Sequence, residues 1–219
     1  MALTLNQARR VYDRIGRVQD WQAFYEDAST DRLVANAALG ADQRIFEFGC
    51  GTGRLAERLL RAMPASVNYL GVDLSPAMIA LTTGRLTAWA DRADAVLVDG
   101  SLPLPADDES ADRVLSTFVL DLLDADYARD VLADLRRVLA PGGRLCLASL
   151  THGDGLLERA LSRTWTGLWH VAPQLVGGCR PITVAAVLGH DWQIQHHSHV
   201  HRWGLVSEVV VAAPRARPQ

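Results

Sequence analysis

The chain has 219 residues, with 22 Lys+Arg against 25 Asp+Glu and a formal net charge of −3. This length can bury one large core, so we expect a single domain over residues 1–219. The slightly acidic balance argues against a nucleic-acid partner, because nucleic acids are bound by a basic face. Three widely spaced cysteines do not suggest a disulfide framework. Neither a membrane-spanning run nor a signal-peptide core is present, which predicts a cytoplasmic protein.

The first forty residues are expected to form a helical cover. Apolar residues at helical spacing predict a helix or helix pair over residues 5–25 and a further helix over 30–39. Within residues 41–150, strands alternate with helices, a pattern typical of a parallel sheet with helices on both faces. We interpret residues 1–40 as a lid and residues 41–150 as a core that binds a cofactor.

The pattern loosens after residue 150. Helices are expected over residues 156–170 and 182–188, followed by two closing strands over 192–200 and 205–213. We interpret residues 151–219 as the substrate side of the protein, and the last six residues as a frayed tail.

The most informative motif is the glycine-rich turn Glu47-Phe48-Gly49-Cys50-Gly51-Thr52-Gly53, between a predicted strand and a predicted helix. Such a turn lets a ligand lie against bare backbone, with helix N-terminal amides pointing at it. The third small residue of a dinucleotide turn would fall on Arg54, and the lysine of a P-loop is absent. Glu47 would repel a pyrophosphate and favour a cationic ligand. S-adenosylmethionine, which carries an ammonium and a sulfonium, meets this requirement.

Two further predicted strands also end in an acid. Asp73 lies twenty residues beyond Gly53, close to the spacing at which a carboxylate meets ribose hydroxyls. Ser75 is expected to cap the next helix, and Met78 on that helix is expected to face the turn and support an adenine ring. Asp99 is expected to accept from the adenine amino group. A single acid would more simply be a solvated loop carboxylate or a helix cap, but the succession of strand ends favours a nucleoside pocket.

Together these pieces resemble the class I S-adenosylmethionine-dependent methyltransferases over roughly residues 40 to 150. The motifs that carry the resemblance are Glu47-x-Gly49-x-Gly51-Thr52-Gly53, Gly71-Val72-Asp73-Leu74-Ser75, Asp99-Gly100, Leu104-Pro105, Asp112-Arg113-Val114-Leu115 and Leu135-Arg136-Arg137-Val138-Leu139-Ala140-Pro141-Gly142-Gly143. The resemblance implies an α/β fold, a Rossmann-like doubly wound and mostly parallel seven-stranded sheet with an antiparallel last strand.

Within that superfamily the chain is most similar to the branch of ubiquinone/menaquinone-biosynthesis and phospholipid N-methyltransferases. This narrower resemblance rests on Tyr12-Asp13-Arg14-Ile15 and Gly177-Gly178-Cys179-Arg180-Pro181. Together with the strand-end acids, it implies S-adenosyl-L-methionine as cofactor and S-adenosyl-L-homocysteine as product. The residues expected to bind the cofactor are Tyr12, Glu47, Gly49, Cys50, Gly51, Gly53, Asp73, Leu74, Met78, Asp99, Gly100, Ser101, Thr117 and Phe118.

The expected mechanism needs no protein nucleophile, because the sulfonium already activates the methyl group. The protein must hold acceptor, methyl carbon and sulfur in line. If the acceptor must lose a proton, Asp121 and His152 are the candidate catalytic residues. Asp121 could equally cap the following turn, and His152 could be a solvated loop residue. Tyr12, Trp21 and Tyr25 could close the pocket or simply anchor a helix to the core.

Several late residues have two interpretations each. His197, His199 and His201 would share one face of a strand, yet imidazoles spread along a line match a tetrahedral metal site poorly. We therefore predict no metal site and a polar outer face of an edge strand. Arg180 could bind an acidic substrate group. Two tryptophans four residues apart could line a pocket for a quaternary ammonium or belong to the core, namely Trp165 and Trp169.

Three functional hypotheses stay open at this point. The first is a methyltransferase for a small-molecule or lipid acceptor. The second is a non-catalytic module, or regulatory subunit, that binds S-adenosylmethionine. The third is a membrane-surface phospholipid N-methyltransferase whose N-terminal helix makes weak contact with anionic head groups, through Arg9, Arg10, Arg14 and Arg17 above Val11, Ile15 and Val18. The sequence indicates neither the acceptor nor the oligomeric state.

Overall fold

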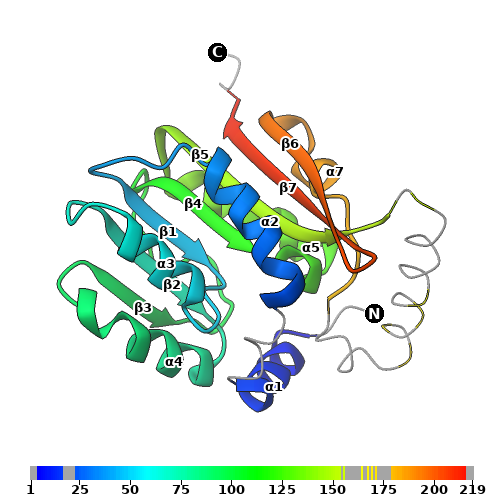
Figure 1. Ribbon diagram of the computed structural model, residues 1–219, viewed down its shortest axis with the longest axis horizontal. Helices are drawn as coiled ribbons and strands as arrows, with labels where there is room; N and C mark the ends of the chain where they lie inside the picture. Colours follow the sequence, from blue (N-terminus) through cyan, green and yellow to red (C-terminus); the bar gives the residue numbers. More distant parts are fainter. Residues whose placement is uncertain are drawn as a thin grey trace.

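The computed structural model describes residues 4–16, 23–153, 155, 164, 167, 169, 171 and 179–215. Its centre is a seven-stranded sheet with the strand order β3-β2-β1-β4-β5-β7-β6 (Figure 1). The strands are β1 (Arg44–Phe48), β2 (Asn68–Asp73), β3 (Ala93–Leu97), β4 (Ala111–Thr117), β5 (Leu139–Thr151), β6 (Trp192–Arg202) and β7 (Leu205–Pro214). Neighbouring strands from β3 through β5 pair in parallel, whereas β7 pairs antiparallel with both β5 and β6. The predicted fold class is confirmed.

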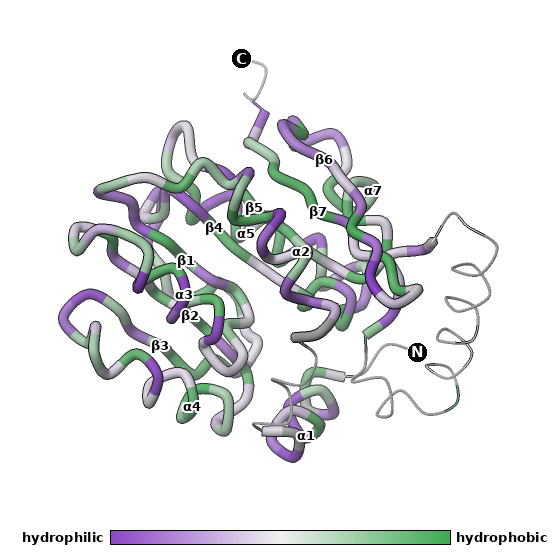
Figure 2. Tube along the Cα trace, in the orientation of Figure 1, coloured by the Kyte–Doolittle hydropathy of each residue, from purple (hydrophilic) through white to green (hydrophobic). Residues whose placement is uncertain are grey.

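Helices cover both faces of this sheet (Figure 1). The α-helices are α1 (Leu5–Ile15), α2 (Ala23–Asn36), α3 (Arg54–Ala62), α4 (Pro76–Leu86), α5 (Ala125–Val138) and α7 (Val184–Leu188). Short 3₁₀ turns are η2 (Thr87–Trp89), η3 (Leu120–Leu122) and η5 (Gly189–Asp191). Apolar residues of α2 and α3 join one core cluster, and those of α5 and α7 join the cluster on the other side of the sheet. Figure 2 shows the central strands as largely hydrophobic and the edge strand β6 as largely hydrophilic.

Local signals explain where two of these helices begin. The Ser75 hydroxyl accepts a hydrogen bond from Met78 N at 3.2 Å, and Pro76 occupies the first turn, so the predicted start of α4 is confirmed. The Asp124 side chain accepts from Asp126 N at 3.1 Å and Tyr127 N at 2.9 Å at the start of α5. Because both caps follow β-strands closely, they fix how the chain leaves the carboxyl edge of the sheet.

The predicted boundaries of the N-terminal helices are wrong. We expected one helix to end at residue 25 and another to begin at residue 30, but Ala23–Asn36 is a single helix. Ser29 and Thr30 resemble capping residues in the sequence; in the structure their hydroxyls donate to the Glu26 carbonyl, at 2.8 and 2.9 Å, inside the helix. Residues 17–22, with Trp21 and Val18, lie outside the described residues.

The C-terminal predictions have mixed outcomes. The two closing strands are confirmed. Most of the helix expected over 156–170 lies outside the described residues. Two residues of the predicted frayed tail are ordered: Pro214 ends β7, and Arg215 N donates to the Asp191 carbonyl at 2.9 Å. Residues 216–219 lie outside the described residues. The division of the chain at residues 40 and 150 stays a prediction.

Candidate active site

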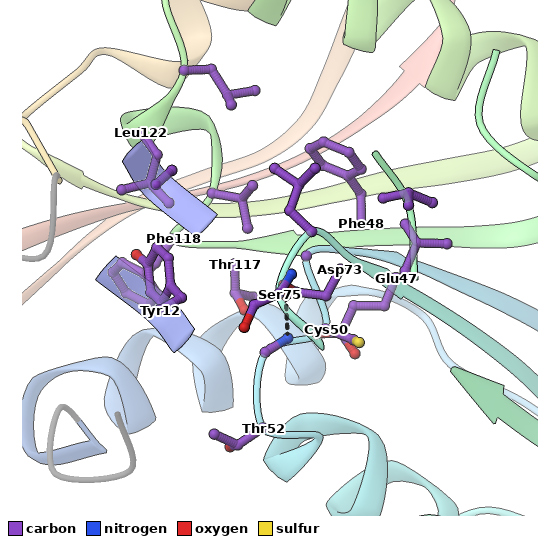
Figure 3. A pocket seen from close by; sticks show the side chains of 18 of the residues that line it. Tyr12, Glu47, Phe48, Cys50, Thr52, Asp73, Ser75, Thr117, Phe118 and Leu122 are labelled. Atoms are coloured by element: carbon purple, nitrogen blue, oxygen red, sulfur yellow. Dashed lines mark hydrogen bonds between the residues drawn. The ribbon is translucent and has the colours of Figure 1, made fainter. Parts of the chain in front are cut away.

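A cavity opens at the carboxyl ends of the parallel strands, where the strand order reverses between β1 and β4. Ligands of open α/β sheets bind at this switch point. The sheet, the glycine-rich turn and the helices α1 and α2 all contribute to its wall. Figure 3 shows side chains around this cavity, with Asp73 and Thr117 near its centre and Tyr12 and Phe118 to one side.

The glycine-rich turn needs glycine for its backbone conformation and for the space around it. Gly49, Gly51 and Gly53 all have positive φ, at 78°, 53° and 78°. A Cβ on Gly49 would lie 2.3 Å from Val119 Cγ2, and one on Gly53 would lie 2.9 Å from Thr82 Cγ2. At Gly51 no atom lies within 4 Å of the added Cβ, and the residue lines the cavity. Gly51 therefore keeps the backbone open to a ligand, whereas the other two glycines let the turn pack.

Asp73 connects the end of β2 to this turn. One carboxylate oxygen accepts from Gly51 N at 3.0 Å, and the other accepts from Ser75 N at 2.8 Å. Burial raises the pKa of Asp73, and these backbone hydrogen bonds oppose that shift. The Ser75 hydroxyl also donates to Asp13 Oδ1 at 2.6 Å, which attaches α1 to the same corner. A negative carboxylate is thus held beside bare backbone on the cavity wall.

Glu47 is a second buried acid of the cavity, on β1. Its Oε2 accepts a hydrogen bond from the Tyr69 hydroxyl at 2.6 Å, and burial raises the pKa of Glu47 to about 8. The bond requires Gly71, because a Cβ there would lie 2.6 Å from the Tyr69 hydroxyl and 2.8 Å from Cys50 Cβ. A carboxyl in this environment loses its proton readily only when a positive charge arrives.

Glu26 is a third acid of the cavity and is not among the residues predicted from the sequence. It lies on α2, its Oε1 is shielded from solvent, and that oxygen has no hydrogen-bond partner among the described residues. Burial raises the pKa of Glu26 to about 7, an effect that a hydrogen bond with Tyr25 only partly offsets. Glu26, Thr30 and Leu33 are spaced so that they share one face of a helix. If the sequence had been read as one helix from residue 23 to 36, this spacing would have predicted Glu26 on its inner face.

The helix that carries Glu26 is fixed to α3 by ion pairs. Asp27 pairs with Arg54, and Asp31 pairs with Arg58 at 2.5 Å. The two acids and the two arginines are each four residues apart, so both pairs lie along matching faces of the helices. Arg54 and Arg58 also line the cavity and bring positive charge close to the turn.

The candidate base Asp121 lies behind the cavity wall rather than in it. Its Oδ2 accepts from Leu150 N at 3.1 Å, so it bonds to β5 and not to the turn that follows it. Its Oδ1 is buried without a hydrogen-bond partner among the described residues, and burial raises the pKa of Asp121 to about 7. Loss of contact with water raises the pKa of both Tyr12 and Cys179, and the nearby charge of Asp121 adds to each shift.

His152 is exposed, and the structure does not bring it to the described cavity lining. Asp99 is also exposed, and its carboxylate accepts from Ser101 N at 2.8 Å and from the Ser101 hydroxyl at 2.6 Å; these bonds lower the pKa of Asp99. Met78 is buried beneath its helix, with 1% of its surface exposed. Neither Asp99 nor Met78 is part of the described cavity lining. This geometry does not place either residue where the expected contact with adenine requires it.

The remaining expectations separate into two groups. The predicted residues that do line the cavity are Tyr12, Glu47, Gly49, Cys50, Gly51, Asp73, Leu74, Gly100, Thr117 and Phe118. Gly53 and Ser101 support neighbouring residues instead. Phe118 has a positive φ of 56°. Its ring packs edge-on against the ring of Tyr25, with the two ring centroids 5.7 Å apart. Backbone strain at a non-glycine residue is common beside functional sites.

Arg180 and Trp169, for which the sequence allows two interpretations each, contact other parts of the protein. Arg180 donates to the Leu123 carbonyl at 2.8 Å, and its guanidinium lies 5.7 Å from the ring centre of Trp169. Trp169 is buried. Trp165 lies outside the described residues. The tryptophan pair therefore stays untested as an ammonium pocket.

Comparisons with known proteins agree with this geometry. A family model described as a methyltransferase domain matches residues 45–143. Demethylmenaquinone methyltransferase of Tropheryma whipplei is 30% identical over 148 residues, which are 67% of this chain and 57% of that protein. The chain belongs to the class I S-adenosylmethionine-dependent methyltransferases. The match spans little more than half the length of that relative.

Solved structures with low sequence identity share the fold. The [4+2]-cyclase SpnF has a TM-score of 0.76 at 18% identity, over 97% of each chain. The N-methyltransferase NodS of Bradyrhizobium japonicum, in complex with S-adenosyl-l-homocysteine, has a TM-score of 0.73 at 17% identity, over 95% of this chain and 99% of that chain. Among the described residues, none of the helices is long and apolar enough to cross a bilayer.

Proposed function

We propose that the protein transfers a methyl group from S-adenosyl-L-methionine to a small-molecule or lipid acceptor and releases S-adenosyl-L-homocysteine. The observation that carries this proposal is the pairing of Asp73 with Gly51 N at the switch point, beside the buried carboxyl of Glu47. A cationic nucleoside satisfies both acids, whereas a diphosphate would meet repulsion from them.

The cofactor would be held in parts by different elements. Asp73 keeps lone pairs free for the ribose hydroxyls, because each carboxylate oxygen can accept more than one hydrogen bond. Apolar side chains lining the cavity beyond it, Leu74, Val98 and Leu104, would enclose the adenine. Glu47 would become ionised next to the positive charge of the donor. Arg54 and Arg58 would attract the methionine carboxylate.

Glu26 is the acid that we assign to the acceptor. It lines the cavity, whereas Asp121 and His152 do not belong to the described lining, and its Oε1 is free for a donor group. The acceptor atom attacks the methyl carbon in line, the carbon–sulfur bond breaks, and its electron pair stays on sulfur. The proton lost by a hydroxyl or amine acceptor passes to Glu26, whose pKa of about 7 suits a general base at neutral pH.

A second candidate is a protein that binds S-adenosylmethionine without transferring its methyl group. Its support is that one of the solved structures with this fold is a [4+2]-cyclase by name. A fold can host unrelated reactions, so the site must decide. The narrower branch of quinone and phospholipid methyltransferases and the cytoplasmic location stay predictions.

Membrane contact through α1 also stays a prediction, and the structure reduces its support. Leu5, Ala8 and Tyr12 line the cavity, and Ala8 is buried. Part of the apolar face of α1 thus packs against the protein, which leaves less of it for a bilayer.

The test separates the two candidate functions. Calorimetric titration with S-adenosylmethionine comes first, followed by measurement of S-adenosylhomocysteine release over a panel of amines, phenols, quinols and thiols. Binding with turnover on one acceptor class supports methyl transfer. Binding without turnover on the whole panel favours the second candidate, and no binding of the donor rejects both.

A further inference from the structure

The outer half of the sheet brings together two histidines and a glutamate that are distant in the sequence. His197 and His199 lie on the same face of β6, the edge strand, because they are two residues apart. In the antiparallel register of β6 with β7, His199 lies directly opposite Glu208 and His197 opposite Val210. The register therefore places the three residues on the same face of two neighbouring strands, which lie side by side in Figure 1.

We propose that His197, His199 and Glu208 form a binding site for a divalent transition-metal ion such as Zn²⁺. Their candidate ligand atoms, two imidazole nitrogens and one carboxylate oxygen, all lie within 4.8 Å of one another. Bond lengths of about 2.0–2.2 Å require tetrahedral zinc ligands to lie roughly 3.3–3.6 Å apart. The His197 Nε2–Glu208 Oε1 separation is 2.9 Å. Small rotations of the exposed imidazole side chains would bring the three atoms to that spacing.

Glu208 has the properties of a preorganised ligand. It has 0% of its surface exposed. Its Oε2 accepts from Val184 N at 2.6 Å, and its Oε1 accepts from Ala185 N at 3.2 Å. These two backbone hydrogen bonds at the start of α7 hold the carboxylate plane in place, as outer contacts of metal ligands do. Among the described residues its side-chain partner is the imidazole of His197, and a metal cation between the two groups would compensate the buried negative charge.

The donor set selects the kind of ion. Two imidazoles and one carboxylate suit zinc, cobalt(II) or nickel(II) rather than magnesium or calcium, which prefer oxygen ligands. Three protein ligands leave a further position for water. The half-exposed His197 and the exposed His199 leave this side open for the ion to enter.

Glu208, the third proposed ligand, cannot be predicted from the histidines of β6 alone. His197 and His199 by themselves form a line along a strand, which matches a tetrahedral site poorly. Glu208 supplies the missing direction from the adjacent strand, and its position depends on the register of the hairpin between β6 and β7.

A bound ion would stabilise the segment between Arg180 and the start of α7. Glu208 holds the first residues of α7, Ile182 N donates to the Leu150 carbonyl at 2.9 Å, and Arg180 N donates to the Asp121 carbonyl at 3.2 Å. This segment crosses the carboxyl end of β5. The ion would therefore connect β6, β7 and the start of α7, and it would stabilise the folded state without taking part in methyl transfer.

The test is a titration of the untagged full chain with Co²⁺ and Zn²⁺. We expect one equivalent of Co²⁺ to bind with the visible absorption of a tetrahedral site, Zn²⁺ to displace it, and the melting temperature to rise. His197→Ala and His199→Ala should each weaken binding at least tenfold and remove the thermal shift. His196→Ala is the matched control, because His196 lies on the opposite face and bonds to Ser198 at 2.9 Å.

Glu208→Gln tests the carboxylate, with circular dichroism as a check because Glu208 also holds α7. If this variant does not fold, the double variant His197→Ala/His199→Ala replaces it. Equal weakening by His196→Ala, a stoichiometry above one, or unchanged binding in the double variant would overturn the proposal, because each indicates adventitious binding to surface imidazoles. None of these readouts depends on methyl transfer.

Discussion

The substitution Asp73→Asn tests the assignment of the ribose site. In the free protein both carboxylate oxygens are in use, with Gly51 N at 3.0 Å and Ser75 N at 2.8 Å. An amide keeps one acceptor oxygen, but its NH₂ group must face one of these two N–H donors. The loss of one hydrogen bond to a charged acceptor costs about 1.5–3 kcal/mol, so we expect the free energy of unfolding to fall by about that amount.

The effect on the cofactor should be larger than the effect on folding. The two ribose hydroxyls would both donate to Asp73, and the loss of a charged acceptor costs about 1.5–3 kcal/mol for each. The sum of roughly 3–6 kcal/mol corresponds to a 10²–10⁴-fold increase in Kd. Because asparagine can still accept from one hydroxyl, we expect a value near the lower end, about 10²-fold.

Calorimetric titration with S-adenosylmethionine measures this change, and Asp99→Asn is the matched control. Both acids follow parallel strands, but Asp99 is exposed and bonds to Ser101. We expect its substitution to change Kd less than about threefold, since exposed polar contacts contribute little. Wild-type affinity in Asp73→Asn, or equal weakening in Asp99→Asn, would refute the assignment.

Three further predictions concern the buried acids. Gly71→Ala places a Cβ 2.6 Å from the Tyr69 hydroxyl, so urea unfolding should show a loss of about 1–3 kcal/mol, whereas Gly84→Ala, with no atom within 4 Å of its Cβ, should be neutral or stabilising. Glu26→Gln should leave the Kd of S-adenosylmethionine within a few-fold and lower kcat about 10²-fold or more; an unchanged kcat would contradict its role as base. The raised pKa values of Glu26 and Glu47, about 7 and about 8 against 4.5 for the ordinary carboxyl, contribute stability below pH 4.5 that is lost as pH rises toward 8. The urea midpoint of the free protein should therefore fall over that window, and Glu47→Gln should flatten its upper part.

The part of the cavity lining around the glycine-rich turn could be predicted because its information is local in the sequence. The turn from Glu47 to Gly53 is continuous, and Asp73 follows at the interval that one helix and one strand require. Asp99 shows the limit of that reasoning. An acid at a strand end has the right position, but its direction depends on its neighbours, and the backbone and hydroxyl of Ser101 hold it at the surface.

The N-terminal cover was harder to predict because its polar residues have two compatible uses. Ser29 and Thr30 are good capping residues, yet they also bond to a carbonyl one turn earlier within a helix. The mistaken boundary hid the inner face of α2. Glu26 lies on that face, so the acid that we now assign to the acceptor could not be recognised.

The sequence indicates the cofactor more clearly than the acceptor, because residues near the glycine-rich turn are close in the sequence and residues on the proposed acceptor side are not. In the proposed site the cofactor would lie against one βαβ unit, in which the Gly51 amide and the Asp73 carboxylate, 22 residues apart, bond to each other. The proposed acceptor side combines α2, the residues after β4 and the segment near Cys179. Burial raises the pKa of Tyr12 and of Cys179, and the charges of Asp121 and Glu26 add to both shifts across these segments. No sequence periodicity connects residues so far apart in the chain. Whether they come into contact depends on which helix packs on which face of the sheet. Acceptor specificity can therefore change through α2 and the late segment while the glycine turn stays intact, which is how one fold serves different acceptors.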